Sequence, residues 1–148
     1  ERAAVILGII SIFNAFGRIL FGIASDKIGR YPVIILLFAV IGGSMLLLTR
    51  SGGLVFTMAL GAISMCYGGF TAMFSPVCAD NFGIKNLSSN YGLFFIAYGI
   101  AGVIGPQLAA QAKLIGGGYD LAFITAAIMA AVGIALTVCL MANAIRRT

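Results

Sequence analysis

One basic side chain of this sequence stands inside a long apolar stretch, where a positive charge is unfavourable. Arg18 lies seven residues before Ser25, at which the stretch becomes polar. An arginine near the centre of a membrane-spanning helix costs roughly 2.5–3.5 kcal/mol, so an unassisted one is not expected. Helical spacing places Arg18 on one face with Ser11, Asn14 and Ser25. Such a polar face is typical of a helix that lines a bundle interior or a water-filled path.

Two interpretations of Arg18 are open. If its side chain lines a cavity, the guanidinium is a bidentate receptor for a carboxylate. If the side chain instead reaches along the helix to the membrane interface, about 10 Å away, the residue is structural.

Polar side chains in two later apolar stretches are candidates for the same cavity. The third stretch carries four hydroxyl groups on one helical face, and the fourth adds three polar candidates: Ser64, Tyr67, Thr71 and Ser75, then Asn90, Tyr98 and Gln107. We favour Tyr67 and Tyr98 as residues that contact a small polar solute. An ordinary hydrogen bond between helices is the alternative for each of them.

Groups for acid–base or covalent catalysis do not occur in a usable arrangement. The chain has no histidine, and its four acidic residues stand at the ends of apolar stretches or in turns. The three cysteines are scattered without a CxxC pair. We therefore expect neither an enzyme nor a metal or cofactor site. The same distribution leaves no acid in mid-membrane to relay protons.

The elements that must position these residues are helices that span a membrane. Hydrophobic residues make up 61% of the chain and charged residues 9%, against roughly 25% charged in a soluble domain. Five apolar runs each have the roughly 17–25 residues that a spanning helix needs. The sequence therefore predicts an all-α, polytopic transmembrane bundle with helices at about Ala3–Ser25, Tyr31–Thr49, Leu54–Cys78, Asn90–Ala112 and Leu121–Ala144.

The basic residues predict the orientation of this bundle. Lysine and arginine in short loops favour the cytoplasmic side. One side receives Lys27, Arg30, Lys85, Arg146 and Arg147, and the other receives Arg2, Arg50 and Lys113. We therefore expect the Asp26–Arg30 turn and the C-terminus in the cytoplasm. The net charge of +5 reports topology, and no nucleic-acid partner is expected.

Connections and glycines complete the pattern. The longest expected loop is Asp80–Ser89. The chain begins at Glu1, close to a span, and we expect no signal peptide before it. An odd number of spans without a soluble domain suggests a piece of a larger protein. In the fourth stretch, three glycines at a spacing of three suit close helix packing, and a proline bends or loosens the same helix: Gly99, Gly102, Gly105 and Pro106.

The turn after the first stretch resembles a known motif. Gly22, Asp26, Lys27, Gly29 and Arg30 match the GxxxD(R/K)xGR loop of the major facilitator superfamily, which joins the second and third helices of each six-helix half. Tyr31 stands where a further basic residue is common. The resemblance implies a gating loop, whose charge contacts with the other half are remade as the transporter alternates.

Two further stretches resemble one branch of that superfamily. The segment from Asp80 to Gly92, with Ala97-Tyr98-Gly99 and Gly105-Pro106, is similar to helices 10 and 11 of the oxalate:formate antiporter family and its monocarboxylate relatives. The run from Asn14 to Arg18 resembles their helix 8, whose arginine binds the carboxylate substrate. Residues 1–148 then form a partial C-terminal six-helix domain, helices 8–12.

The resemblance implies secondary active transport of a small organic anion by alternating access, in the inner (plasma) membrane. Arg18 then holds the carboxylate, Asn14 positions it, and Tyr67 and Tyr98 shape the cavity. The oxalate transporters have a lysine where this chain has Tyr98, so one cation favours a monocarboxylate such as lactate, pyruvate or formate over oxalate. The expected partners are the anion, the lipid bilayer, the missing N-terminal half and a co-transported proton.

Two alternatives stay open at this point. A transporter of the same fold for an uncharged or cationic solute, such as a sugar or a drug, shares the Gly22–Arg30 loop but has no need of Arg18. A membrane assembly subunit without transport activity uses the glycine-rich helices for packing alone. That alternative predicts Arg18 paired with an acid from a loop.

Overall fold

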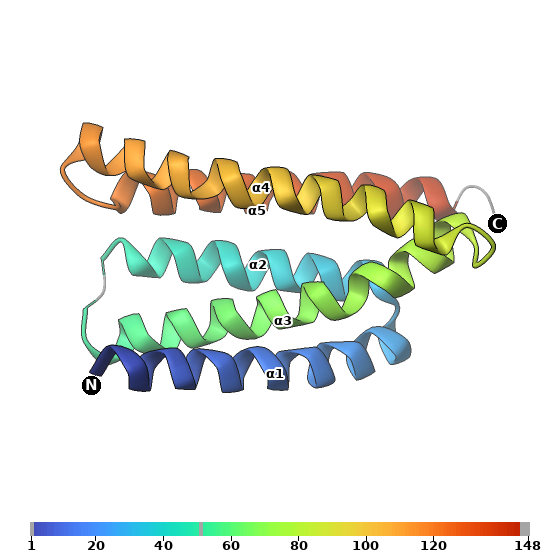
Figure 1. Cartoon of the computed structure of the whole chain (residues 1–148), viewed down its shortest axis with the longest axis horizontal. Coiled ribbons are helices and arrows are strands. Elements are labelled where there is room, and N and C mark those ends of the chain that lie inside the picture. Colours follow the sequence, from blue (N-terminus) through green and yellow to red (C-terminus); the bar gives the residue numbers. More distant parts are fainter. Residues whose placement is uncertain (1, 51, 146–148) are drawn as a thin grey trace.

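The chain forms a bundle of long helices. The computed structural model describes residues 2–50 and 52–145, which form α1 (Arg2–Ile28), α2 (Arg30–Leu48), α3 (Leu54–Phe82), α4 (Leu87–Gly116) and α5 (Asp120–Ile145). All five are long and apolar enough to cross a membrane, and the described part contains no strand. Successive helices run antiparallel, with α1 at one edge, α2 and α3 in the middle, and α4 and α5 at the other edge (Figure 1). The predicted all-α transmembrane bundle is confirmed.

The helices are longer than predicted at one end of the bundle. The expected loop Asp80–Ser89 is wrong, because α3 continues to Phe82 and α4 begins at Leu87. A proline within a helix removes one hydrogen bond and often ends the helix, yet α3 passes through Pro76. It ends at Gly83, whose φ of 76° only glycine adopts readily, and whose N–H bonds to the Ala79 carbonyl at 2.9 Å.

Glycines bring the backbones of α1 and α3 into contact. A Cβ at Gly17 would overlap the carbonyl of Met65, and a Cβ at Gly68 would overlap the carbonyl of Asn14. Two hydrogen bonds cross the same junction: Ser64 Oγ donates to the Ile10 carbonyl at 2.6 Å, and Asn14 Nδ2 donates to the Ser64 carbonyl at 3.3 Å. Small residues and polar side chains are the usual means of holding helices together in a membrane. The two helices therefore form one tightly packed unit.

The remaining core lies along α2, which packs on α3 and on α5. Its centre consists of side chains with at most 1% of their surface exposed: Val33, Leu37, Cys66 and Met73. Toward α5, the ring of Phe38 fills the space that Gly133 leaves open, since a Cβ there would lie 2.6 Å from Phe38 Cζ. Phe38 also packs against Phe70 of α3, with ring centroids 4.7 Å apart. Helix α2 thus connects the α1–α3 unit to α5.

Helix α4 is the least covered element, since none of its residues is buried. A Cβ at Gly99, Gly102 or Gly105 would meet no described atom within 4 Å. These glycines therefore do not pack against another helix of the described chain, and close packing there stays a prediction that needs a neighbour outside it. The helix continues through Pro106 to Gly116.

Candidate functional site

An open, partly polar cavity lies between α1 and α3. Its volume is about 470 Å³, and its lining includes both Asn14 and Tyr67, which the sequence pattern had singled out. The remaining lining consists of two serines and three aliphatic side chains: Ser11, Ser64, Ile10, Leu60 and Ile63. Ser11 donates its hydroxyl hydrogen to the Leu7 carbonyl of its own helix at 2.9 Å. The cavity therefore sits directly on the tight junction of α1 and α3.

Arg18 lies one helical turn beyond Asn14, outside the lining of this cavity. Its side chain is exposed, and it forms no ion pair within residues 2–50 and 52–145. Its backbone is held in the junction, since a Cβ at Gly68 would lie 3.3 Å from the Arg18 nitrogen. The guanidinium is thus carried by a rigid part of the bundle without an acidic partner in the described chain.

The two predicted tyrosines lie side by side across the seam between α3 and α4. The ring centroids of Tyr67 and Tyr98 are 6.3 Å apart, and 44% and 39% of their respective surfaces are exposed. The seam continues through Phe74, whose ring centroid lies 6.4 Å from Tyr98 and 6.3 Å from Phe94. The structure therefore brings Asn14, Tyr67 and Tyr98 into one continuous region, with Arg18 at its edge.

A second group of polar residues, here called the latch, fastens the end of α1 and the start of α2 to the end of α3. It comprises Ser25, Asp26, Arg30, Tyr31, Asp80 and Asn81. Arg30 Nε donates to Asp80 Oδ2 at 3.1 Å, and Arg30 Nη1 donates to Asp26 Oδ1 and, at 2.8 Å, to Ser25 Oγ. Beside them, the Tyr31 hydroxyl donates to Asn81 Oδ1 at 2.8 Å. The Arg30–Asp80 and Tyr31–Asn81 bonds join α2 to α3, and the bonds from Arg30 to Asp26 and Ser25 join α2 to α1.

The predicted gating residues divide into two sets. Asp26 and Arg30 belong to the latch, and Gly29, with φ 96°, provides the turn between them. Lys27 is exposed and pairs with no acid in the described chain, and a Cβ at Gly22 would meet no described atom within 4 Å. Roles for Lys27 and Gly22 in contacts with another part of the protein stay predictions. Glu1, Arg146 and Arg147 lie outside the described residues.

Sequence reasoning did not single out Asp80 and Asn81, the partners of Arg30 and Tyr31 in the latch. The sequence predicts a loop for both, whereas they lie in the last turn of α3, at the end of the bundle where Arg30 lies. The sequence did contain a signal, because Asp80 and Arg30 are both expected on the same side of the membrane. Opposite charges at one end of a helical bundle commonly pair.

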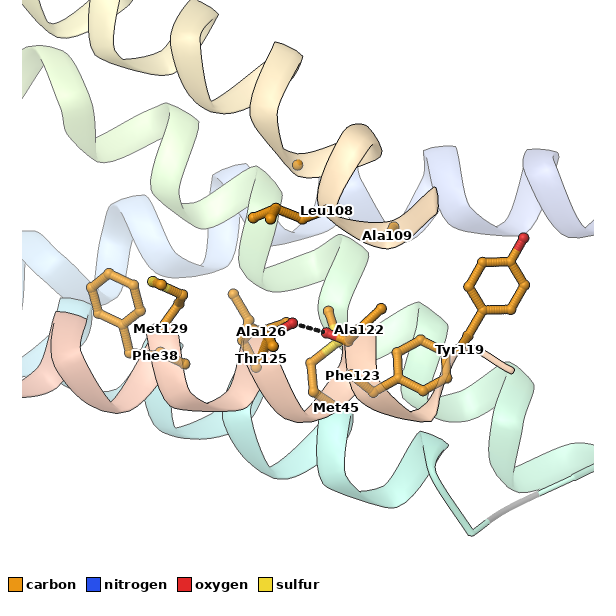
Figure 2. A pocket seen from close by; sticks show the side chains of 13 residues that line it. Phe38, Met45, Leu108, Ala109, Tyr119, Ala122, Phe123, Thr125, Ala126 and Met129 are labelled. Atoms are coloured by element: carbon orange, nitrogen blue, oxygen red, sulfur yellow. Dashed lines mark hydrogen bonds between the residues drawn. The ribbon is translucent and has the colours of Figure 1, made fainter. Parts of the chain in front are cut away.

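A larger cavity, shown in Figure 2, is almost entirely apolar and offers no site for an anion. Its volume is about 490 Å³, and α2, α4 and α5 line it, with Phe38 and Tyr119 at opposite ends of the view. The Thr125 hydroxyl already donates to the Ala122 carbonyl at 2.9 Å. Of the predicted functional residues, the lining includes only Gly105.

Comparisons with known proteins show the family of this chain. A family model described as Major Facilitator Superfamily matches residues 2–147. The chain is 33% identical over 103 residues to the uncharacterized MFS-type transporter YhjX of Escherichia coli (strain K12), covering 68% of this chain and 26% of that protein. It is 32% identical over 129 residues to the oxalate:formate antiporter of Oxalobacter formigenes, covering 85% of this chain and 31% of that protein. No solved structure matches.

Proposed function

This chain belongs to the major facilitator superfamily, and we propose that it is part of a transporter that moves a small organic anion by alternating access. The observation that carries the proposal is Arg18, an exposed guanidinium within a membrane helix that forms no ion pair within the described residues. A charge in that position is retained at a cost, which a bound carboxylate offsets through two parallel hydrogen bonds.

The residues around Arg18 support a small ligand that is polar at one end. Asn14 lies one turn away and donates one of its two amide hydrogens to the Ser64 carbonyl. Its second amide hydrogen and its side-chain oxygen stay available to a solute. Tyr67 and Tyr98 present half-exposed rings and hydroxyl groups to the same region. In this arrangement Arg18 and Asn14 bind, and the tyrosines shape the site.

The charge count favours a monocarboxylate such as lactate, pyruvate or formate. Among the described residues, Arg18 is the single basic side chain placed away from the helix ends, and Tyr98 contributes no charge. The relative from Oxalobacter formigenes bears the name oxalate:formate antiporter, which supports small organic anions as a class. A second cation in the rest of the transporter would extend the range to oxalate.

The chain spans 26% and 31% of the two curated relatives, and we propose that it is helices 8–12 of the C-terminal six-helix domain. The missing N-terminal half then faces the site and the uncovered glycines of α4. The chain is part of a multi-pass membrane protein, for which we propose the inner (plasma) membrane with the latch and the C-terminus in the cytoplasm. A proton that accompanies the anion would use acids outside this chain.

The latch suggests how the cycle is regulated at the cytoplasmic end. Alternating access requires the two halves to rock about a site near the middle of the membrane. Arg30 pairs with the carboxylates of Asp26 and Asp80 at once. If one of them is replaced by an acid of the other half, the contacts of the Asp26–Arg30 turn change, but Arg30 still has a carboxylate partner. We propose that the latch residues exchange partners with the other half during each cycle.

Competition for uptake tests the substrate class. The full-length transporter would be reconstituted in liposomes, and uptake of labelled lactate measured with unlabelled pyruvate, formate, oxalate or glucose. Competition by the monocarboxylates alone is the expected result. Competition by oxalate as well would place a second cation in the other half, whereas competition by glucose, or indifference to every anion, would contradict the proposal.

A further inference from the structure

A third, partly open cavity is separate from the polar cavity beside α1. Its volume is about 470 Å³, and it is bounded by four helices, α2, α3, α4 and α5. Five phenylalanine rings dominate its wall: Phe38, Phe70, Phe74, Phe82 and Phe94. Phe38 also lines the apolar cavity of Figure 2, so that ring separates the two spaces. The dimensions are those of a site for a small organic molecule.

One end of this cavity is polar and uncharged. Tyr31 and Asn81 line this end, and the Tyr31 hydroxyl donates to Asn81 Oδ1. Each of these two oxygens can still accept a hydrogen bond from a ligand. The Asn81 amide already donates to the Val77 carbonyl at 2.8 Å with one hydrogen and keeps the other. Thr137 donates its hydroxyl hydrogen to the Gly133 carbonyl at 2.7 Å. Among the described residues, no charged side chain lines the cavity.

The position of the polar end matters as much as its chemistry. Tyr31 and Phe38 are seven residues apart on α2, so the cavity runs about 10 Å from the latch toward the middle of the bundle. Tyr31 follows Arg30 directly, and Asn81 follows Asp80. The bonded pairs Arg30–Asp80 and Tyr31–Asn81 therefore lie next to each other, and each joins α2 to α3. A molecule in the cavity would therefore contact the neutral half of the latch.

We propose that this cavity binds one uncharged amphiphile from the membrane, with its apolar body among the phenylalanines and a single hydroxyl group at Tyr31 and Asn81. The described residues that line the cavity carry no charge, so an uncharged ligand avoids the cost of desolvating an ion there. A ligand that binds only the arrangement in which α2 and α3 are fastened stabilises that arrangement. Building on the proposed transport function, occupancy holds the latch closed and slows transport without competing with the anion.

Photolabelling tests the site independently of transport. The probe is octanol that carries a photoreactive diazirine, applied to the full-length transporter in liposomes. The expected labels lie on cavity-lining residues of α3 and α5, and excess octanol suppresses them. Leu140→Trp narrows the cavity, because Leu140 lines it, whereas Leu136→Trp makes the same change one turn earlier on an exposed position outside the lining. Labelling should fall in the first variant alone.

A second variant covers the case in which Leu140→Trp fails to fold. Tyr31→Phe removes only the hydroxyl and should weaken protection by octanol about fivefold, the effect of one neutral hydrogen bond. Equal labelling in the two tryptophan variants, or unchanged protection in Tyr31→Phe, would overturn the site.

Uptake measurements test the coupling to the latch. Octanol should inhibit anion uptake less in Leu140→Trp than in Leu136→Trp. Any effect of octanol on the bilayer itself is the same for both variants and does not contribute to the difference. Correct labelling with equal inhibition in both variants would overturn the coupling. A protein that takes up no anion but labels as expected would contradict the proposed transport function and leave the site intact.

Discussion

Arg30 Nε lies 3.1 Å from Asp80 Oδ2, although the two residues are 50 positions apart in the sequence. The same guanidinium holds Asp26 of α1 and the hydroxyl of the buried Ser25, whose own hydrogen is donated to the Gly22 carbonyl at 2.8 Å. Arg30 therefore ties three helices together at one end of the bundle. The charges of this turn are thus paired with residues of the same chain.

Replacement of Asp80 tests the latch. Asp80→Asn keeps the shape of the side chain but removes the charge, and a partly exposed pair of this kind contributes about 0.2–1 kcal/mol. We expect a protein of normal abundance whose uptake rate changes by about fivefold at most, because the balance between conformations shifts by that energy. Asp120→Asn, an exposed acid at the other end of the bundle, is the control and should leave the rate unchanged. Identical rates in both variants would contradict a gating role for Asp80.

The junction of α1 and α3 predicts an asymmetric response to alanine. Gly17→Ala places a methyl group against the Met65 carbonyl, so the helices must separate, at a cost of about 1–3 kcal/mol. Gly8→Ala is the matched change in the same helix, where a Cβ meets nothing within 4 Å, and it should be neutral or slightly stabilising. Thermal unfolding in detergent measures both. Equal melting temperatures would show that the backbones are not in contact.

Adding a second cation should change the substrate preference. In Tyr98→Lys, a positive charge enters the region shared with Tyr67 and strengthens binding of a dianion more than of a monoanion. We expect the ratio of oxalate to formate inhibition of lactate uptake to rise about tenfold, which corresponds to roughly 1.4 kcal/mol. Tyr91→Lys, two turns earlier in α4, serves as the control. An unchanged ratio in Tyr98→Lys would place Tyr98 away from the anion.

Much of the fold could be predicted because the physics of a spanning helix is local. A run of apolar residues long enough to cross the bilayer must satisfy its own backbone hydrogen bonds, and this requirement located all five helices. It did not locate their ends at the membrane surface, where a polar residue can be helical or not. Asp80 and Asn81 were assigned to a loop for that reason, and the partner of Arg30 was missed with them.

Packing partners were less predictable, since they depend on neighbours distant in sequence. The spacing of Gly99, Gly102 and Gly105 suggested close packing, yet the described glycines whose Cβ would overlap a backbone carbonyl are Gly17 and Gly68. Nothing local distinguishes these two sets. Among the site residues, helical spacing correctly placed Asn14 and Arg18 one turn apart on α1. The contact between Tyr67 and Tyr98 depends on how α4 docks against α3, which spacing does not determine.

Uptake by an Arg18→Gln variant tests the central claim most directly. Labelled lactate, pyruvate and formate would each be offered to the reconstituted full-length transporter, beside Arg50→Gln, the same change at an exposed turn. If Arg18 binds the carboxylate, its variant should lose at least about thirtyfold in uptake, since truncating one partner of a hydrogen-bonded charge pair costs about 2–5 kcal/mol. Abundance and melting temperature should match those of Arg50→Gln. Normal uptake by a normally expressed Arg18→Gln protein would contradict the account.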